Sequence, residues 1–285
     1  MRVLRGILAA SRPISWVNTA FPYGLAYLLV GNGLDWLFWV GVIFFLIPYN
    51  IAMYGINDIF DYESDILNPR KGGVEGAVLP RSMHAPLLWA SVLTTLPFLV
   101  VMFASGTWRS ALWLAVSMAA VVAYSAPPLR FKERPVLDSA TSAAHFVTPA
   151  IVGATIRTEE LPGYFWVAVA SFFLWGMASH ALGAVQDVRA DREGNLSSIA
   201  TAFGARAVTR LAAGTYLLAA LLLFLLPAPG WVVGLAGLGY VVNVLRFWTI
   251  TDDTCEDVNR GWRVFLWLNY LVGAIVSISL ATVYL

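Results

Sequence analysis

The sequence carries little charge and almost no cysteine. Asp, Glu, Lys and Arg make up only 12% of its 285 residues, whereas soluble domains carry about 25%. A formal net charge of +1 argues against nucleic acid as a partner, because proteins that bind it gather cationic side chains to neutralise phosphates. The single cysteine, Cys255, excludes an internal disulfide bond.

Apolar side chains, in contrast, are abundant. They account for 59% of the residues, and the mean hydropathy is +0.72. A soluble core of this chain length cannot absorb so much apolar surface, so composition predicts an all-α polytopic membrane protein. In lipid, a helix satisfies its own backbone hydrogen bonds, which makes it the natural spanning element.

Nine apolar segments are long enough, or nearly so, for a bilayer that needs about twenty residues per helix. Pro22, Pro48 and Pro149 fall inside spans, where a kink is tolerated if neighbours satisfy the freed carbonyl. The sequence therefore predicts nine transmembrane helices. Their expected ranges are 14–31, 36–57, 85–105, 110–126, 138–156, 163–186, 208–227, 230–250 and 264–285.

The basic residues are distributed unevenly between the two predicted sides. With nine spans, all of the 18 Lys and Arg except Arg109 and Arg157 share the side of the N-terminus. The positive-inside rule places that side in the cytoplasm, so we expect a multi-pass protein of the cell (plasma) membrane with a cytoplasmic N-terminus. Two longer loops there, about residues 66–84 and 187–207, are interpreted as caps over the site of a single domain, residues 1–285.

Acidic residues form a row at the end of the second predicted span. Asn57, Asp61 and Asp65 are spaced i, i+4 and i+8 and so share one helical face, with Asp58 on its flank. The alternative is an ordinary solvated helix end. Because carboxylates at a membrane helix mouth repel one another, and because hard divalent ions prefer oxygen ligands, the row favours a Mg²⁺ site.

A second row, Asp187 and Asp191, closes the sixth predicted span at the same i, i+4 spacing. Arg189 and Arg192 offer a local structural alternative, because they can neutralise these acids without a metal. Since both rows close spans on the predicted cytoplasmic side, we expect them to face one pocket. Metal ions held there would bind a diphosphate, with the active site facing the cytoplasm.

Basic and polar residues near the rows complete the predicted site. Arg and Lys can pair with phosphate oxygens, although the turn after the fourth span also fits a plain proline turn with positive-inside charge. The expected diphosphate-binding residues are Arg70, Lys71, Tyr124, Arg130 and Lys132. Asn18, Asn50 and Tyr54 lie deeper in the spans and are candidates for the substrate pocket; hydrogen bonds between helices are the alternative for the two asparagines.

These motifs resemble those of the UbiA superfamily of intramembrane prenyltransferases. Asn57–Asp65 is similar to that family's N-D-x-x-D-x-x-x-D motif, and Asp187–Asp191 to the core of its second motif, D-x-x-D-x-x-x-D. The turn Tyr124–Lys132 and the nine-span topology also agree, so the resemblance covers nearly the whole chain. One departure is that the first Asp of the second motif falls at Ala184, which leaves Asp187 and Asp191 as its acids.

The resemblance implies a helical bundle around a central cavity and a Mg²⁺-dependent enzyme. An allylic diphosphate, dimethylallyl diphosphate being the expected one, would bind through Mg²⁺, its cofactor. Asp61, Asp187 and Asp191 would be catalytic. The implied metal ligands are Asn57, Asp58, Asp61, Asp65, Asp187 and Asp191. The developing charge on the leaving diphosphate would be stabilised by metal and cations, while apolar walls keep water from the allylic cation.

The loop from Asn68 to Leu79 resembles the lycopene elongases of this superfamily, which add dimethylallyl units to the ends of lycopene, some with hydration. Lycopene is therefore the expected lipophilic acceptor, and a carotenoid cyclase is a candidate membrane partner. A quinone precursor or a glycerol lipid is the alternative acceptor. A transporter or cation channel is the alternative of another class, but its acids should lie at the bilayer midplane rather than at helix ends on one side.

Overall fold

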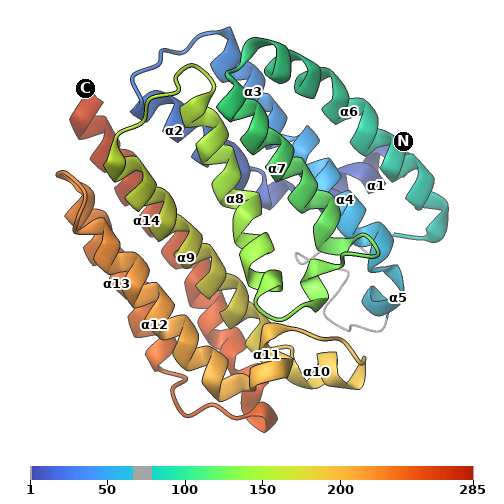
Figure 1. Cartoon of the computed structure of the whole chain (residues 1–285). Coiled ribbons are helices and arrows are strands. Elements are labelled where there is room, and N and C mark those ends of the chain that lie inside the picture. Colours follow the sequence, from blue (N-terminus) through green and yellow to red (C-terminus); the bar gives the residue numbers. More distant parts are fainter. Residues whose placement is uncertain (1, 67–78, 285) are drawn as a thin grey trace. The chain divides into compact units, whose positions relative to one another are not determined.

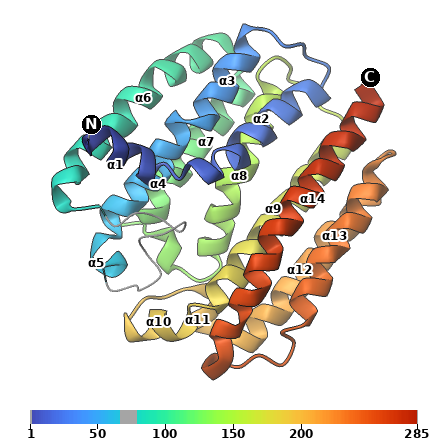
Figure 2. The same ribbon diagram turned by 180° about the vertical axis from the view of Figure 1, so that it is seen from behind.

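The computed structural model describes residues 2–66 and 79–284, and every regular element within those residues is a helix. The chain divides into two compact units. Unit 1 comprises Met1–Phe131 and Ala144–Leu161, and unit 2 comprises Lys132–Ala143 and Pro162–Leu285. Figures 1 and 2 show the helices of each unit from opposite sides.

Unit 1 is built around α4, which packs against α1, α3, α6 and α7. Its core holds large aromatic side chains, among them the fully buried Tyr23, Phe44 and Tyr49. The elements of this unit are α1 (Arg2–Ala10), η1 (Pro13–Ser15), α2 (Val17–Leu29), α3 (Trp36–Leu46), α4 (Pro48–Phe60), α5 (Tyr62–Asp65), η2 (Arg81–Met83), α6 (His84–Ser105), α7 (Trp108–Ser125) and the larger part of α8 (Leu137–Thr155).

The long helices of unit 2 form a bundle in which α12 packs against α9 and α13, and α14 packs against α13 and α9. Figure 2 shows these helices side by side. The elements of this unit are most of η3 (Phe131–Glu133), the start of α8, α9 (Gly163–Val185), α10 (Val188–Glu193), α11 (Ile199–Phe203), α12 (Ala205–Leu223), α13 (Gly230–Leu245), η4 (Asp252–Val258) and α14 (Asn259–Tyr284).

Each of the nine predicted spans is occupied largely by helix, which confirms the all-helical class. Within the described residues, five helical segments are long and apolar enough to cross a membrane. They are Trp36–Phe60, Arg81–Ser105, Gly163–Val185, Ala205–Leu223 and Asp252–Ser279. Nine crossings, the cytoplasmic N-terminus and the single-domain organisation remain predictions.

The second predicted span is interrupted at Pro48, as its proline predicts. Pro48 has no N–H, so α3 ends at Leu46 and α4 begins afresh at Pro48. Asn50 satisfies the carbonyls that this break releases, because its Nδ2 donates to the oxygens of Phe45 and Leu46 at 2.8 and 3.1 Å. The carbonyl groups at the end of α3 are therefore hydrogen-bonded by a side chain from the first turn of α4.

Candidate active site

The first acidic row lies where α4 ends. Asn57 Nδ2 donates to Asp61 Oδ2 at 2.7 Å and to Ser125 Oγ, at the end of α7, at 2.9 Å. Asn57 and Asp61 therefore share a face, as their spacing predicts. Since both amide hydrogens are directed at these partners, the carbonyl oxygen Oδ1 of Asn57 is left as its acceptor atom. A buried carboxylate and an oriented amide oxygen are thus set side by side.

Asp58 has a different partner. Its Oδ1 accepts from Arg12 Nη2 at 3.0 Å, and the two side chains are only 3% and 16% exposed. The Arg12 guanidinium also lies 4.3 Å from the centre of the Tyr54 ring. Arg12 has a φ of 50°, a left-handed backbone that costs a residue with a Cβ about 1 kcal/mol. The ion pair and the ring contact hold it there, so Asp58 fixes the N-terminal segment against α4.

The second acidic row repeats the local backbone of the first. Asp61 follows α4 with φ −98° and ψ 0°, and Asp187 follows α9 with φ −100° and ψ −3°. This sparsely populated bridge region is common among active-site residues. Each aspartate lies between a long helix and a short one, α5 or α10. The same D-x-x-x-D segment thus forms the same helix break in each unit.

In unit 2 the arginines beside the second row have acidic partners on η4. Arg189 lies 3.7 Å from Glu256, and Arg192 lies 2.7 Å from Asp252. Asp252 also accepts the backbone N–H of Ala205 at 2.7 Å. Arg189 and Arg192, which offered the local alternative for the second row, therefore connect the segment 187–207 to η4.

Unit 2 also contains a buried hydrogen-bond network centred on Asp138. Asp138, 0% exposed, accepts from the backbone N–H of Ser139 and of Ile199, each at 2.6 Å. Its Oδ1 also accepts from Ser139 Oγ at 3.2 Å, and that hydroxyl lies 3.1 Å from His180 Nδ1. Asp138 thus joins the start of α8 to the N-terminus of α11, and through Ser139 to α9.

The predicted pocket residues of unit 1 have varied surroundings. Asn50 is fully buried and donates to Thr19 Oγ1 at 2.8 Å as well as to the carbonyls beside Pro48, so it forms the interhelical bonds of the alternative interpretation. Asn18 is exposed on α2. Tyr54 is half-buried beneath Arg12. Their role toward a substrate remains a prediction.

The predicted diphosphate-binding residues are only partly described. Tyr124, near the end of α7, packs edge-on against His145 with ring centres 5.3 Å apart. Arg130 and Lys132 follow in the turn and are half-buried, Arg130 in unit 1 and Lys132 in unit 2. Arg70, Lys71 and the side chain of Asp65 lie outside the described residues.

The donor set in unit 1 fits magnesium by its chemistry. Mg²⁺ is commonly held by one or two carboxylates, with substrate phosphates and water completing its ligands. Asp61 and the Oδ1 of Asn57 are oxygen donors of this kind. Among residues 2–66 and 79–284, no three His, Cys, Asp or Glu side chains are grouped as a metal site by themselves. The arrangement suits a metal that binds together with a phosphate ligand.

Sequence reasoning does not identify Arg12, Ser125 or Asp138 as parts of these clusters. Asp138 offers a signal, because an acid at the start of an apolar span is costly unless it is hydrogen-bonded. Arg12 counts only as a cytoplasmic charge, and Ser125 only as part of the proline turn. Arg12 pairs with Asp58, 46 residues away, and Ser125 with Asn57, 68 residues away. The spacing of residues along one helix cannot predict such contacts between distant segments.

Comparison with known proteins gives matches along the whole chain. The UbiA prenyltransferase family matches residues 19–269. A lycopene elongase/hydratase of Corynebacterium glutamicum is 63% identical over 284 residues, covering 100% of this chain and 99% of that protein. A C(50) beta-cyclic carotenoids biosynthesis protein of Dietzia sp. is 54% identical, covering 96% of this chain and 64% of that longer protein.

Among solved structures, a UbiA homologue from Archaeoglobus fulgidus bound to GPP and Mg²⁺ has a similar fold. The TM-score is 0.70, and the match covers 94% of this chain and 99% of the homologue. At 17% sequence identity, this likeness concerns the course of the backbone. It agrees with the all-helical architecture described above.

Proposed function

Because the chain belongs to the UbiA prenyltransferase family, an all-helical family of enzymes that transfer prenyl groups, we propose that it transfers dimethylallyl groups to the ends of lycopene. The observation that carries this proposal is the 63% identity, over the whole length of both chains, to a lycopene elongase/hydratase. The family alone leaves the acceptor open, whereas identity at this level along the entire chain favours a shared substrate.

The donor in this proposal is an allylic diphosphate bound with Mg²⁺. Support comes from the oxygen donors Asn57 and Asp61 in unit 1 and from the equivalent helix break at Asp187, with Asp191 one turn later. It comes also from the A. fulgidus homologue, which binds GPP and Mg²⁺. Mg²⁺ would neutralise charge that develops on the leaving diphosphate. Asp65 would assist, and Asp58 would act mainly through Arg12.

Side chains of the protein would bind the diphosphate and shield the allylic cation from water. Arg70, Lys71, Arg130 and Lys132 would pair with the phosphate oxygens, and Tyr124 would border them. Once the carbon–oxygen bond of the donor breaks, the allylic cation needs walls free of water. A terminal double bond of lycopene then forms the new carbon–carbon bond. The resulting tertiary cation loses a proton, for which released diphosphate can be the base, or adds water.

The same proposal includes the membrane topology. Nine crossings, a cytoplasmic N-terminus and a plasma-membrane location are supported by helices in all nine predicted ranges and by the uneven distribution of Lys and Arg. The segments 66–84 and 187–207 would cap the site from the cytoplasm. A carotenoid cyclase would be the partner that consumes the elongated product, which the name of the longer Dietzia relative supports.

The test is incubation of membranes containing the protein with lycopene and dimethylallyl diphosphate, followed by mass analysis of the pigments. We expect products heavier than lycopene by one and two prenyl units, with or without water, and none when a chelator removes Mg²⁺. If lycopene remains unchanged while a quinone precursor or a glycerol lipid is prenylated, the acceptor is wrong. If no acceptor is prenylated, the enzymatic proposal fails.

A further inference from the structure

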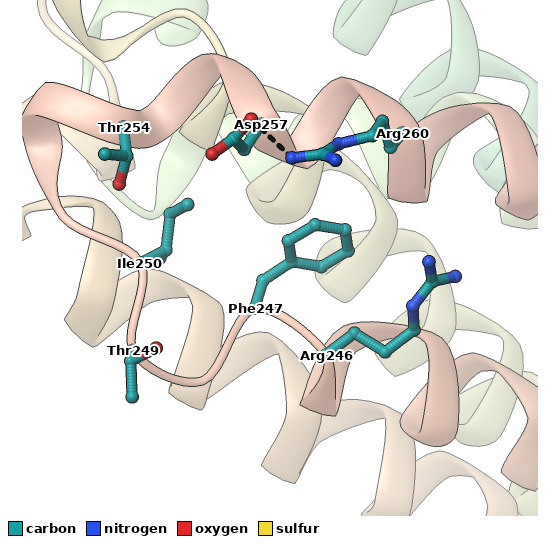
Figure 3. Close-up of a pocket in the computed structure, with 7 residues that line it drawn as sticks. All are labelled: Arg246, Phe247, Thr249, Ile250, Thr254, Asp257 and Arg260. Carbon is teal, nitrogen blue, oxygen red and sulfur yellow. Dashed lines mark hydrogen bonds and ion pairs between the residues drawn. The ribbon is translucent and has the colours of Figure 1, made fainter.

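A pocket with two arginines lies in unit 2, between the end of α13 and the start of α14, and includes residues of η4. Its volume is about 320 Å³, and it is lined by Arg246, Phe247, Thr249, Ile250, Thr254, Asp257 and Arg260. Figure 3 shows Arg246 extending from the end of α13 toward the first turn of α14, with the Phe247 ring between it and Arg260. The proposed prenyl transfer makes no use of these residues.

The pocket is built on a firmly held loop. Arg206 of α12 donates to the carbonyl of Ile250 at 3.2 Å, and Arg210 donates to that of Trp248 at 3.4 Å. On the other side, Asn243 Nδ2 donates to the carbonyl of Gly261 at 2.9 Å. These bonds fix the chain before and after Arg246, so its guanidinium is presented from a stable backbone.

A close approach of α14 sets the wall of the pocket. A Cβ added at Gly261 would lie 2.5 Å from the Phe247 ring, so a residue without a side chain is needed for that ring to pack. Phe247 is only 8% exposed. The pocket therefore has an apolar floor beneath its charged rim.

The charges of the pocket match a single anion. Arg260 Nη2 lies 2.6 Å from Asp257 Oδ1, which neutralises that pair. Arg246 lies over the Phe247 ring at 5.8 Å, and within the described part of the chain it has no acidic partner. One positive charge is left over, which suits one phosphodiester. The hydroxyls of Thr249 and Thr254 add polar contacts at the same rim.

The helix surfaces that lead away from the pocket are apolar. On α13, Leu245 and Val242 are 48% and 64% exposed, and on α14, Trp267 is 76% exposed. A free phosphate would make no use of these faces, whereas acyl chains attached to a phosphate would lie along them. Trp248, with Arg210 over its ring at 4.9 Å, has the character of a residue at the membrane interface.

We infer that this pocket binds the phosphate of an anionic glycerophospholipid of the inner leaflet, with Arg246 as its principal contact and Arg260 as its second. Basic pockets between transmembrane helices on the cytoplasmic side are suited to such headgroups. Asp257 holds Arg260 in place and limits the net charge of the pocket. The inference is independent of the acceptor that the enzyme uses.

The test is lipid retention by the whole protein in nanodiscs that contain phosphatidylcholine and phosphatidylglycerol, measured by native mass spectrometry. We expect wild type to retain phosphatidylglycerol preferentially. Arg246→Gln and Arg260→Gln should each weaken that retention about fivefold. Arg5→Gln, which removes an equal charge from an exposed position on α1, should leave it unchanged. A melting temperature measured in phosphatidylcholine alone verifies that each variant is folded.

Two outcomes would overturn the inference. Equal retention of phosphatidylglycerol by wild type, Arg246→Gln and Arg5→Gln would remove the site. Displacement of the lipid by inorganic diphosphate, with diphosphate bound just as well in phosphatidylcholine alone, would assign the pocket to a free phosphate instead. Retention that depends on Arg246 and resists diphosphate is the result that supports a lipid headgroup.

Discussion

Asp61 and Asp187 have nearly the same backbone angles, in the bridge region, Asp61 directly after α4 and Asp187 one residue beyond Gln186, which caps α9. Four residues later each is followed by a second aspartate, Asp65 or Asp191. Three residues earlier, the first motif has Asp58 and the second has Ala184. The acid that the second motif lacks is thus the one that, in the first, is bonded to Arg12. Asp58 as a metal ligand therefore remains a prediction, and from this correspondence we propose that it acts mainly through Arg12.

Removal of Asp58 should therefore cost stability. Asp58→Ala leaves the largely buried Arg12 without its carboxylate partner, which for a buried ion pair costs about 3 kcal/mol. Replacing both members, by Arg12→Met with Asp58→Leu, should cost less than Asp58→Ala alone, because no charge is left unpaired. Thermal unfolding in detergent measures this. If the single and double variants have the same melting temperature as wild type, the Arg12–Asp58 pair contributes nothing to stability.

Asp35 gives a pH-dependent prediction. Burial raises its pKa, but hydrogen bonds from Tyr27, from the backbone of Phe38 and from Arg157, together with the charge of Arg157, outweigh burial and bring the pKa to about 2 from an ordinary value of 3.8. A lowered pKa stabilises the fold above the ordinary value, and that stability is lost as the pH falls toward about 2. The melting-temperature gap between wild type and Asp35→Asn should shrink across this window. A gap that stays constant would contradict the assignment.

Among the elements, the apolar segments of the sequence are sufficient to predict where the helices lie. They are not sufficient to predict which helices contact one another. The apolar ranges predict all the long helices, and Pro48 predicts the break between α3 and α4. Periodicity describes one helix at a time, so it does not contain the bond from Asn57 to Ser125 or that from Asn50 to Thr19. Those depend on which helices become neighbours.

The segment 187–207 illustrates the same limit. The sequence predicts a cap loop there, and the structure gives it two short helices, α10 and α11. Its anchors lie far away in the chain: Asp138 binds the N-terminus of α11, and Asp252 binds Arg192 and Ala205. Charge counting treats Arg192 only as a possible partner for the adjacent acids.

Loss of Asp138 should loosen this segment. Asp138→Ala leaves the buried N–H of Ile199 without its acceptor, at a cost of about 1–3 kcal/mol. Limited proteolysis should then cleave within 187–207 faster than in wild type. Asp253→Ala, an exposed acid on η4, provides the matched control and should not change the rate. Equal cleavage in all three proteins would mean that Asp138 does not anchor the segment.

For the whole molecule, the testable property is its orientation in the membrane. The only cysteine, Cys255, is fully buried, so an added cysteine can be labelled against a low background. A membrane-impermeant maleimide should label Glu160→Cys in intact cells, and Arg5→Cys only after the membrane is permeabilised, because the charge distribution places the N-terminus inside. Labelling of Arg5→Cys in intact cells would reverse the proposed topology.

We propose that both acidic rows serve one Mg²⁺-dependent prenyl transfer, so each row should be needed for activity. The most direct measurement is the formation of prenylated lycopene by purified Asp61→Asn, Asp187→Asn and Asp253→Asn at saturating Mg²⁺, with circular dichroism to verify folding. We expect the first two to lose at least about a hundredfold in rate, because electrostatic stabilisation of the developing charge usually contributes more to catalysis than any other effect. Asp253→Asn should retain the wild-type rate. Wild-type turnover by either Asp61→Asn or Asp187→Asn would rule out a shared role of the two acidic rows in catalysis.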